Sequence, residues 1–149
     1  MLESIRKTFG LLFAEMHENL RMQVRGLDDG TLNWRPLPKA NSLAVLVTHV
    51  LGSELEMMRS VRSLPAPRDR ESEFHVEMGA ERLLDMIDAA GREMDELIAA
   101  VTDADLMELR PRGDRPPRIG IDWMISNYGH AREHLAQIEL TKQLYDSRT

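Results

Sequence analysis

The sequence predicts an all-α protein, and three observations favour a four-helix bundle. Apolar residues recur at three- and four-residue intervals in four long segments, which is the spacing of one face of an amphipathic helix. Strict alternation of apolar and polar residues, the pattern of a half-buried strand, is absent from the sequence. Stretches rich in proline and charge separate the four segments, so that each helix can fold back on the others.

The composition is that of one globular domain spanning residues 1–149. The chain is 42% hydrophobic and 30% charged, and it is long enough to bury a core without disulfides. A net charge of −6 without a basic tract argues against nucleic-acid binding. No apolar run reaches membrane-spanning length, and the first ten residues lack a secretory hydrophobic region. We therefore expect a cytoplasmic protein with neither a membrane nor a nucleic-acid partner.

The first helix is predicted over residues 2–26, with Gly26 as a stop signal near its end. Residues 27–38 are expected to form an ordered loop, after which Asn41 or Ser42 can cap a second helix over residues 42–63. Glu54 lies in the middle of the apolar stripe of this second helix, where a bare carboxylate would be costly. We expect Glu54 to have a structural role, with a buried arginine as its partner.

The third helix is predicted over residues 79–102 and the fourth over residues 119–145. The segment between them, residues 103–118, contains three prolines and is expected to be a loop. Four arginines gather in it and could attract an anionic substrate, although a solvated loop is the default interpretation. These are Arg110, Arg112, Arg115 and Arg118.

The fourth helix carries an uncharged polar stripe that is typical of a cleft wall. His130 and His134 lie one turn apart on the same face. Trp123, Asn127 and Gln137 fall within about 60° of that line on a helical wheel. A solvated face would normally present lysine and glutamate instead. Trp123 is accordingly a candidate for lining the cleft.

Two histidines at this spacing can bind one metal ion, and His49 on the second helix is the best candidate for a third ligand. Three neutral imidazoles suit zinc, nickel, copper or iron and leave a coordination position open. His17 and His75 are expected to be exposed. The spacing alone fits a pair of surface histidines equally well, so this alternative stays open.

Other chemistries find little support in the sequence. The chain has no cysteine, which excludes thiolate ligands and a cysteine nucleophile. It contains neither a His-Glu-x-x-His motif nor paired Glu-x-x-His motifs, which excludes zincin and di-iron templates. No side chain is identified as catalytic. Asn127, Gln137 and Glu54 are candidate hydrogen-bond acceptors behind the histidines, although Asn127 and Gln137 could equally join helices to one another.

Three motifs carry a resemblance to a known family. Asn33-Trp34-Arg35-Pro36 and Asn41-Ser42-Leu43 lead into the helix that bears His49, and the last helix bears His130-x-x-x-His134-x-x-Gln137. Over nearly the whole chain, the sequence resembles the DinB-like superfamily of bacterial four-helix bundles. The resemblance implies a divalent-metal site formed by His49, His130 and His134. Where the family often has Arg-Gly-Gln after its last histidine, this chain has Leu135-Ala136-Gln137, so the arginine that would contact substrate is missing.

The resemblance also implies a function and an assembly. Members of the family include S-transferases that use bacillithiol or mycothiol, and many are homodimers. We therefore expect zinc or nickel, a low-molecular-weight thiol as cosubstrate, a small electrophile as substrate and a homodimer. The cation would favour the thiolate form of the thiol, which explains why the protein needs no cysteine. The alternatives are a metal-dependent hydrolase without a thiol and a non-catalytic dimeric bundle.

Overall fold

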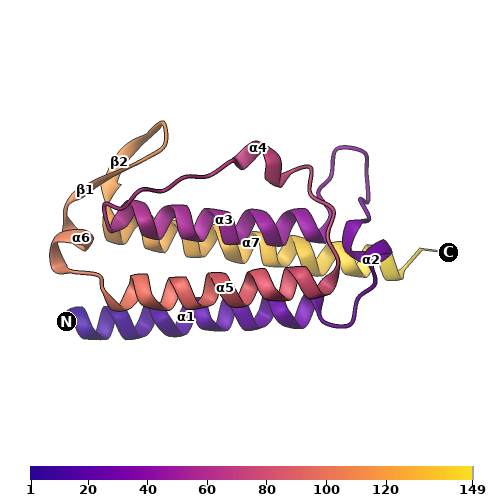
Figure 1. The fold of residues 1–149 in the computed structure, drawn as a ribbon, viewed down its shortest axis with the longest axis horizontal. Helices are drawn as coiled ribbons and strands as arrows, with labels where there is room; N and C mark the ends of the chain where they lie inside the picture. Colours follow the sequence, from indigo (N-terminus) through magenta and orange to yellow (C-terminus); the bar gives the residue numbers. More distant parts are fainter. Residues whose placement is uncertain (149) are drawn as a thin grey trace.

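The computed structural model describes residues 1–148 and confirms the predicted all-α bundle. Its four long helices are α1 (Leu2–Val24), α3 (Leu43–Val61), α5 (Ala80–Ala99) and α7 (Gly120–Asp146). They lie side by side as two pairs, α3 with α7 and α1 with α5 (Figure 1). Each helix begins and ends within a few residues of the bounds that the apolar periodicity predicts. No helix in the described part of the chain is both long and apolar enough to cross a membrane.

Short elements occupy the connections between the long helices. α2 (Asp29–Asn33) precedes α3, and α4 (Arg70–Glu73) lies on the long connection that runs beside α3 (Figure 1). Side-chain caps explain where several helices begin. Ser42 accepts from the backbone N–H of Val45 at the start of α3, and Asp28 caps α2 in the same way.

The prediction of a loop over residues 103–118 was wrong. This segment forms the short helix α6 (Asp103–Met107) and a hairpin of β1 (Leu109–Arg112) and β2 (Arg115–Ile119). The two strands are antiparallel and are joined by the turn Gly113-Asp114, in which Gly113 has the positive φ of 55° that such tight turns require. Prolines obscured the strand pattern, but a two-stranded hairpin tolerates them because both of its strands are edges.

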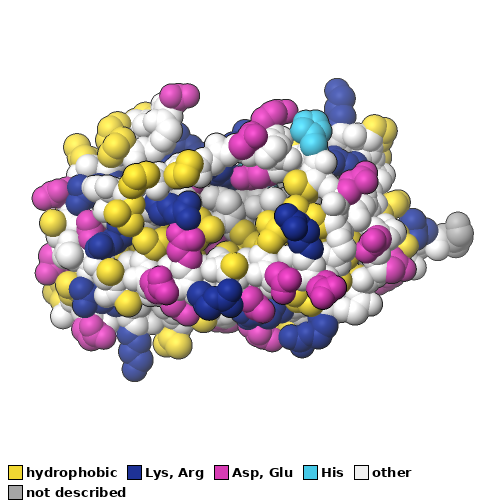
Figure 2. All heavy atoms as spheres, viewed as in Figure 1, with side chains coloured by type: hydrophobic (Ala, Val, Ile, Leu, Met, Phe, Trp, Pro, Cys, Tyr) yellow, Lys and Arg dark blue, Asp and Glu magenta, His cyan; other side chains and the backbone are white. Residues whose placement is uncertain are grey.

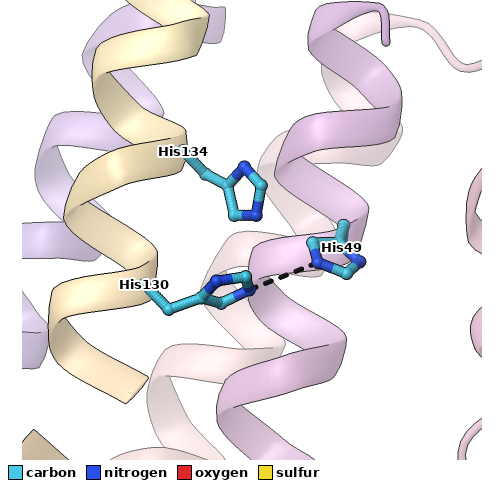
Figure 3. A group of neighbouring side chains, drawn as sticks. All are labelled: His49, His130 and His134. Carbon is cyan, nitrogen blue, oxygen red and sulfur yellow. Dashed lines mark hydrogen bonds between the residues drawn. The ribbon is translucent and has the colours of Figure 1, made fainter. Parts of the chain in front are cut away.

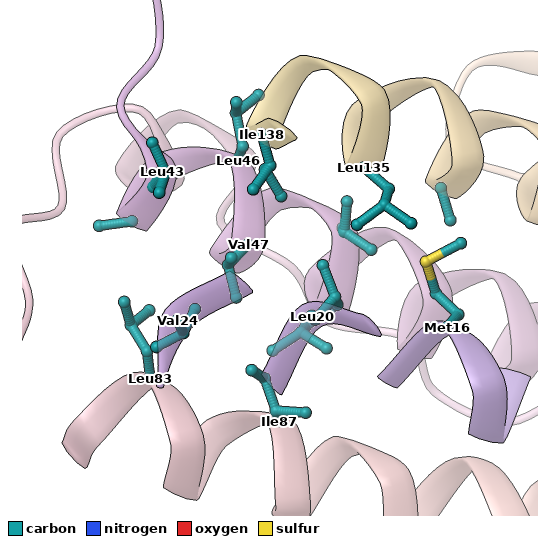
Figure 4. Close-up of a cluster of buried hydrophobic side chains, with 14 of the residues drawn as sticks. Met16, Leu20, Val24, Leu43, Leu46, Val47, Leu83, Ile87, Leu135 and Ile138 are labelled. Atoms are coloured by element: carbon teal, nitrogen blue, oxygen red, sulfur yellow. The ribbon is translucent and has the colours of Figure 1, made fainter. Parts of the chain in front are cut away.

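The core fills the space between the two helix pairs. In one part of it, Leu20, Val47, Ile87 and Ile138 interdigitate from all four long helices (Figure 4). A second cluster around Phe13 packs near the end of the bundle where the hairpin lies. This close packing makes α3 and α7 a rigid pair, and the candidate site is built between them.

A polar pair lies inside the core and corrects two expectations. His17 is only 2% exposed, and its Nε2 lies 2.6 Å from Oε2 of the fully buried Glu54. The prediction that His17 is exposed was therefore wrong, and the partner of Glu54 is a histidine rather than an arginine. Gly91 on α5 makes room for the ring, because a Cβ there would lie 3.3 Å from His17 Nδ1. His75 is exposed, as predicted.

The surface is mixed in charge on the face shown in Figure 2. Acidic and basic side chains alternate over the long helices there and do not gather into one broad patch of a single sign. A broad basic face is the electrostatic footprint of non-specific nucleic-acid binding. The face shown has no such footprint.

Candidate metal centre

Three histidines from two helices converge on one point (Figure 3). His49 comes from α3, and His130 and His134 come from successive turns of α7. Each residue offers one ring nitrogen, and these three nitrogens all lie within 4.8 Å of one another. The Nε2 atoms of His49 and His130 are 3.3 Å apart. Two ligands of a tetrahedral zinc ion, each about 2.0–2.1 Å from the metal, are separated by roughly the same distance.

Hydrogen bonds behind two of the rings orient them toward this point. His49 Nδ1 donates to Glu73 Oε2 over 2.9 Å, and His134 Nδ1 donates to Gln137 Oε1 over 2.7 Å. With the proton on Nδ1, the Nε2 atom of each ring keeps its lone pair and can bind a metal. His134 Nε2 is buried and has no hydrogen-bond partner in the described part of the chain. An unpartnered buried acceptor is costly, and a cation at this point would satisfy it.

Burial and neighbouring charged groups favour the neutral form of the two imidazoles of α7. Burial is the main cause that lowers the pKa of His130, to about 4, and the neighbouring His134 and His49 rings lower it further. Arg112 and Arg115 add to this effect from the hairpin. Burial also lowers the pKa of His134, although its hydrogen bond with Gln137 opposes the shift. Neutral imidazoles are the form that binds a borderline transition-metal cation, so the donor set fits such a metal.

Glu73 is itself held by a network of charges. Arg68 donates to it through Nε over 2.6 Å and through Nη2 over 2.9 Å, and Arg68 Nη1 reaches Glu56 over 3.1 Å. Burial alone would raise the pKa of Glu73, but the hydrogen bonds with His49 and Arg68 outweigh it and lower that pKa. Gly52 on α3 allows this approach, because a Cβ there would overlap Glu73 Oε1 and lie 3.2 Å from Arg68 Nε.

Comparison with known proteins identifies the family of this chain. A family model described as the DinB superfamily matches residues 12–138. The chain belongs to the DinB superfamily. No curated protein matches it significantly in sequence.

Several solved structures have the same fold as this chain. A conserved protein from Enterococcus faecalis is 14% identical, with 97% of this chain and 98% of that chain covered at a TM-score of 0.79. A DinB-like protein from Bacillus cereus is 16% identical, with 94% and 92% covered at a TM-score of 0.76. A DinB-like protein from Bacillus subtilis is 12% identical, with 95% and 94% covered at a TM-score of 0.74. At these identities the likeness shows the fold alone.

The other side chains predicted for the site of this DinB-superfamily protein take different places. Gln137 lies behind His134 as the hydrogen-bond acceptor that was expected there. Asn127 forms no hydrogen bond with the histidines in the described part of the chain; it donates to Ser53 Oγ over 2.9 Å and joins α7 to α3. Glu54 faces His17 and takes no part in this cluster.

Sequence reasoning missed Glu73, the acceptor behind His49. Glu73 ends the four-residue helix α4, where no periodicity indicates which side chain turns inward. Its signal was indirect, because Gly52 lies one turn after His49 and leaves room beside the ring. That space is filled by the protein's own Glu73 and Arg68.

A pocket of about 170 Å³ borders His130 and opens between the hairpin and α7. Arg112 is 4% exposed; its Nε donates to Glu56 over 2.8 Å and its Nη2 to Ser53 Oγ over 2.9 Å. The default interpretation of this arginine cluster as a solvated loop was therefore wrong for Arg112, whereas Arg115 and Arg118 are exposed. The lining residues are Ser53, Arg112, Arg115, Arg118, Trp123, Ser126, Asn127 and His130.

Trp123 forms part of the wall of this pocket. Its ring packs under the guanidinium groups of Arg112 and Arg118, whose central carbons lie 5.5 and 5.1 Å from the ring centroid. Its Nε1 donates to the carbonyl of Arg110 over 2.8 Å. The indole thereby fixes the hairpin on α7, and it holds two cations through their attraction to its π face.

Proposed function

We propose that this protein is a metal-dependent thiol S-transferase. In this proposal His49, His130 and His134 hold a divalent cation, with zinc or nickel as the first candidates. The observation that carries the proposal is the convergence of three imidazoles, with His134 Nε2 buried and unpartnered in the described part of the chain. Three protein ligands leave a coordination position for a small molecule, as in catalytic zinc sites.

The chemistry that the cation supplies when bound is to favour the thiolate form of a thiol that reaches it near neutral pH. The chain contains no cysteine, so the thiol would come from a low-molecular-weight cosubstrate. Glu73 and Gln137 would hold the rings of His49 and His134 with Nε2 directed at the cation. The adjoining pocket would receive the electrophile beside His130.

The metal part of the proposal is tested by elemental analysis and by a matched pair of variants. Protein purified without a metal-affinity tag is expected to bind about one equivalent of zinc or nickel. His134→Ala is expected to lower that affinity at least about 100-fold, because it removes a ligand. His75→Ala removes an exposed histidine and is expected to leave metal binding unchanged. Equal affinities of the two variants would overturn the proposal.

The transfer part needs an assay of its own. Metal-loaded protein is mixed with a chromogenic electrophile, and product is followed with and without added low-molecular-weight thiols, including bacillithiol and mycothiol. Turnover that requires the thiol and is lost in His134→Ala supports S-transfer. Turnover without any thiol would instead support a hydrolase, and turnover with neither would leave a metal-binding bundle without this activity.

A further inference from the structure

We infer that the pocket between the β-hairpin and α7 binds a small oxyanion, a carboxylate or phosphate group, that carries or lies next to a hydrogen-bond donor. The pocket opens beside His130, so the oxyanion would belong to the substrate of the proposed reaction. This assignment to the substrate rests on the proposed function. The pocket itself is argued from charge, burial and size, and it can be tested without a metal.

The hairpin gathers positive charge at a cost. Its register sets Arg110 directly opposite Arg118 and Arg112 directly opposite Arg115. Like charges facing each other across two strands destabilise a hairpin. Arg110 is compensated by Asp105 and Glu108, whereas Arg115 and Arg118 form no salt bridge within the described residues. An anion between the strands and α7 would relieve this repulsion.

Arg112 is anchored so that one nitrogen remains free for a ligand. Its Nε and Nη2 atoms are occupied by Glu56 and Ser53, and its Nη1 has no hydrogen-bond partner among residues 1–148. The guanidinium is therefore held in place before any ligand arrives, and less ordering entropy is lost on binding. Stacking on Trp123 restrains Arg118 in the same way.

The floor of the pocket adds a buried acceptor. Asn127 is 2% exposed, and its Oδ1 has no hydrogen-bond partner in the described part of the chain, although its Nδ2 donates to Ser53. A ligand that brings an O–H or N–H group would satisfy this oxygen. No acidic residue is among the lining residues, so nothing in the wall repels an anion.

Size and position narrow the ligand further. A volume of about 170 Å³ is below the range of drug-sized ligands and suits a small anion or the charged end of a larger molecule. His130 belongs both to the pocket wall and to the histidine cluster. An electrophile anchored by its anionic group would thus place its neighbouring atoms beside the candidate metal.

The experiment titrates the metal-free protein with phosphate, sulfate and lactate at constant ionic strength and follows the indole N–H signals by NMR. The chain has two tryptophans. Trp123 lies in the pocket wall, whereas Trp34 packs edge-to-face against Tyr145 and serves as an internal control. We expect phosphate and lactate each to shift the Trp123 signal saturably and to leave the Trp34 signal in place. Phosphate should bind more tightly than sulfate, because it retains an O–H at neutral pH that Asn127 can accept.

Variants separate the pocket from general charge. Arg115→Gln and Arg118→Gln are each expected to weaken phosphate binding about five- to tenfold. Arg132→Gln makes the same charge change at an exposed position of α7 outside the pocket and should stay within about twofold of wild type.

The inference is overturned if the Trp123 signal does not respond up to about 10 mM anion, or if Arg132→Gln weakens binding as much as Arg115→Gln. Sulfate binding as tightly as phosphate would overturn the role of Asn127. Anion binding that persists in His134→Ala would support the pocket even if metal binding failed. The failure of the anion site and that of the proposed metal centre are therefore told apart.

Discussion

Replacing Glu73 by alanine tests whether the carboxylate behind His49 supports a metal ligand. The substitution removes the acceptor of the 2.9 Å hydrogen bond from His49 Nδ1. Without that acceptor, the ring can rotate and can place its proton on Nε2, the nitrogen that faces the other histidines. Loss of such an outer partner typically lowers metal affinity 10- to 100-fold, which corresponds to about 1.4–2.7 kcal/mol.

The same substitution also has a cost in stability that the assay must separate. Arg68, whose side chain is 7% exposed, loses two hydrogen bonds and keeps its contact with Glu56. Removing one partner of a buried ion pair costs about 3–5 kcal/mol, and the remaining Glu56 contact places the expected loss near the lower limit. A domain with an unfolding free energy of about 5–15 kcal/mol would remain folded.

The measurement is competition for zinc with a chromogenic chelator, on variants whose fold is checked by circular dichroism. Glu73→Gln keeps an oxygen that accepts from His49 and is expected to bind zinc more tightly than Glu73→Ala. Glu71→Gln removes an exposed carboxylate from the same short helix and should match wild type. If zinc affinity in Glu73→Ala stays within about twofold of Glu71→Gln, the reasoning about ring orientation is refuted.

Two further predictions concern Gly52 and Glu54 of α3. Gly52→Ala should lower zinc affinity about tenfold, because the added Cβ displaces Glu73. The control is Gly10→Ala, whose Cβ meets nothing within 4 Å; it should leave zinc affinity unchanged and stabilise α1 by about 0.5–1 kcal/mol. Equal zinc affinities of the two variants would contradict the prediction for Gly52. Burial raises the pKa of Glu54 above its ordinary 4.5, against the hydrogen bond with His17, so the stability that its protonated form contributes is present below about pH 4.5 and lost as the pH rises through the raised value. In urea titrations the free energy of unfolding of Glu54→Gln should therefore rise relative to that of wild type as the pH increases above about 4.5, and a relative fall would refute this.

The four long helices, and the shared face of His130 and His134 on α7, could be predicted from the sequence because they follow from helical geometry. Apolar spacing decides which face of a long helix is buried, and residues four apart share a face whatever the helix packs against. His130 and His134 therefore point the same way before any tertiary contact is known. His49 is different, since only the packing of α3 on α7 brings it to them, and its position beside Gly52 and Ser53 left its surroundings open.

His17 illustrates a signal that was present and overlooked. Glu15 and Glu18 flank it in sequence, which suggested exposure, but its neighbours on a helix surface are three and four residues away. Phe13 and Leu20 occupy those positions and belong to the core. The position of His17 on the helical wheel therefore indicates burial, in contrast to the exposure that its sequence neighbours suggested. The same logic applied to α3 placed Glu54 inside, where a buried carboxylate requires a partner.

Charge pairing outside the long helices obeys no such period, and this is why the surroundings of the site escaped prediction. Each of the 19 basic residues could pair with any of 25 acidic residues, and only the folded structure determines which ion pairs form. Glu56 receives both Arg68 from the connection beside α3 and Arg112 from the hairpin. Through Glu56, these hydrogen bonds connect Glu73 behind the histidines to the pocket between the hairpin and α7. The candidate metal ligands therefore lie on long helices that can be predicted from apolar periodicity. The groups that orient those ligands lie on short segments, and the positions of these segments depend on tertiary contacts.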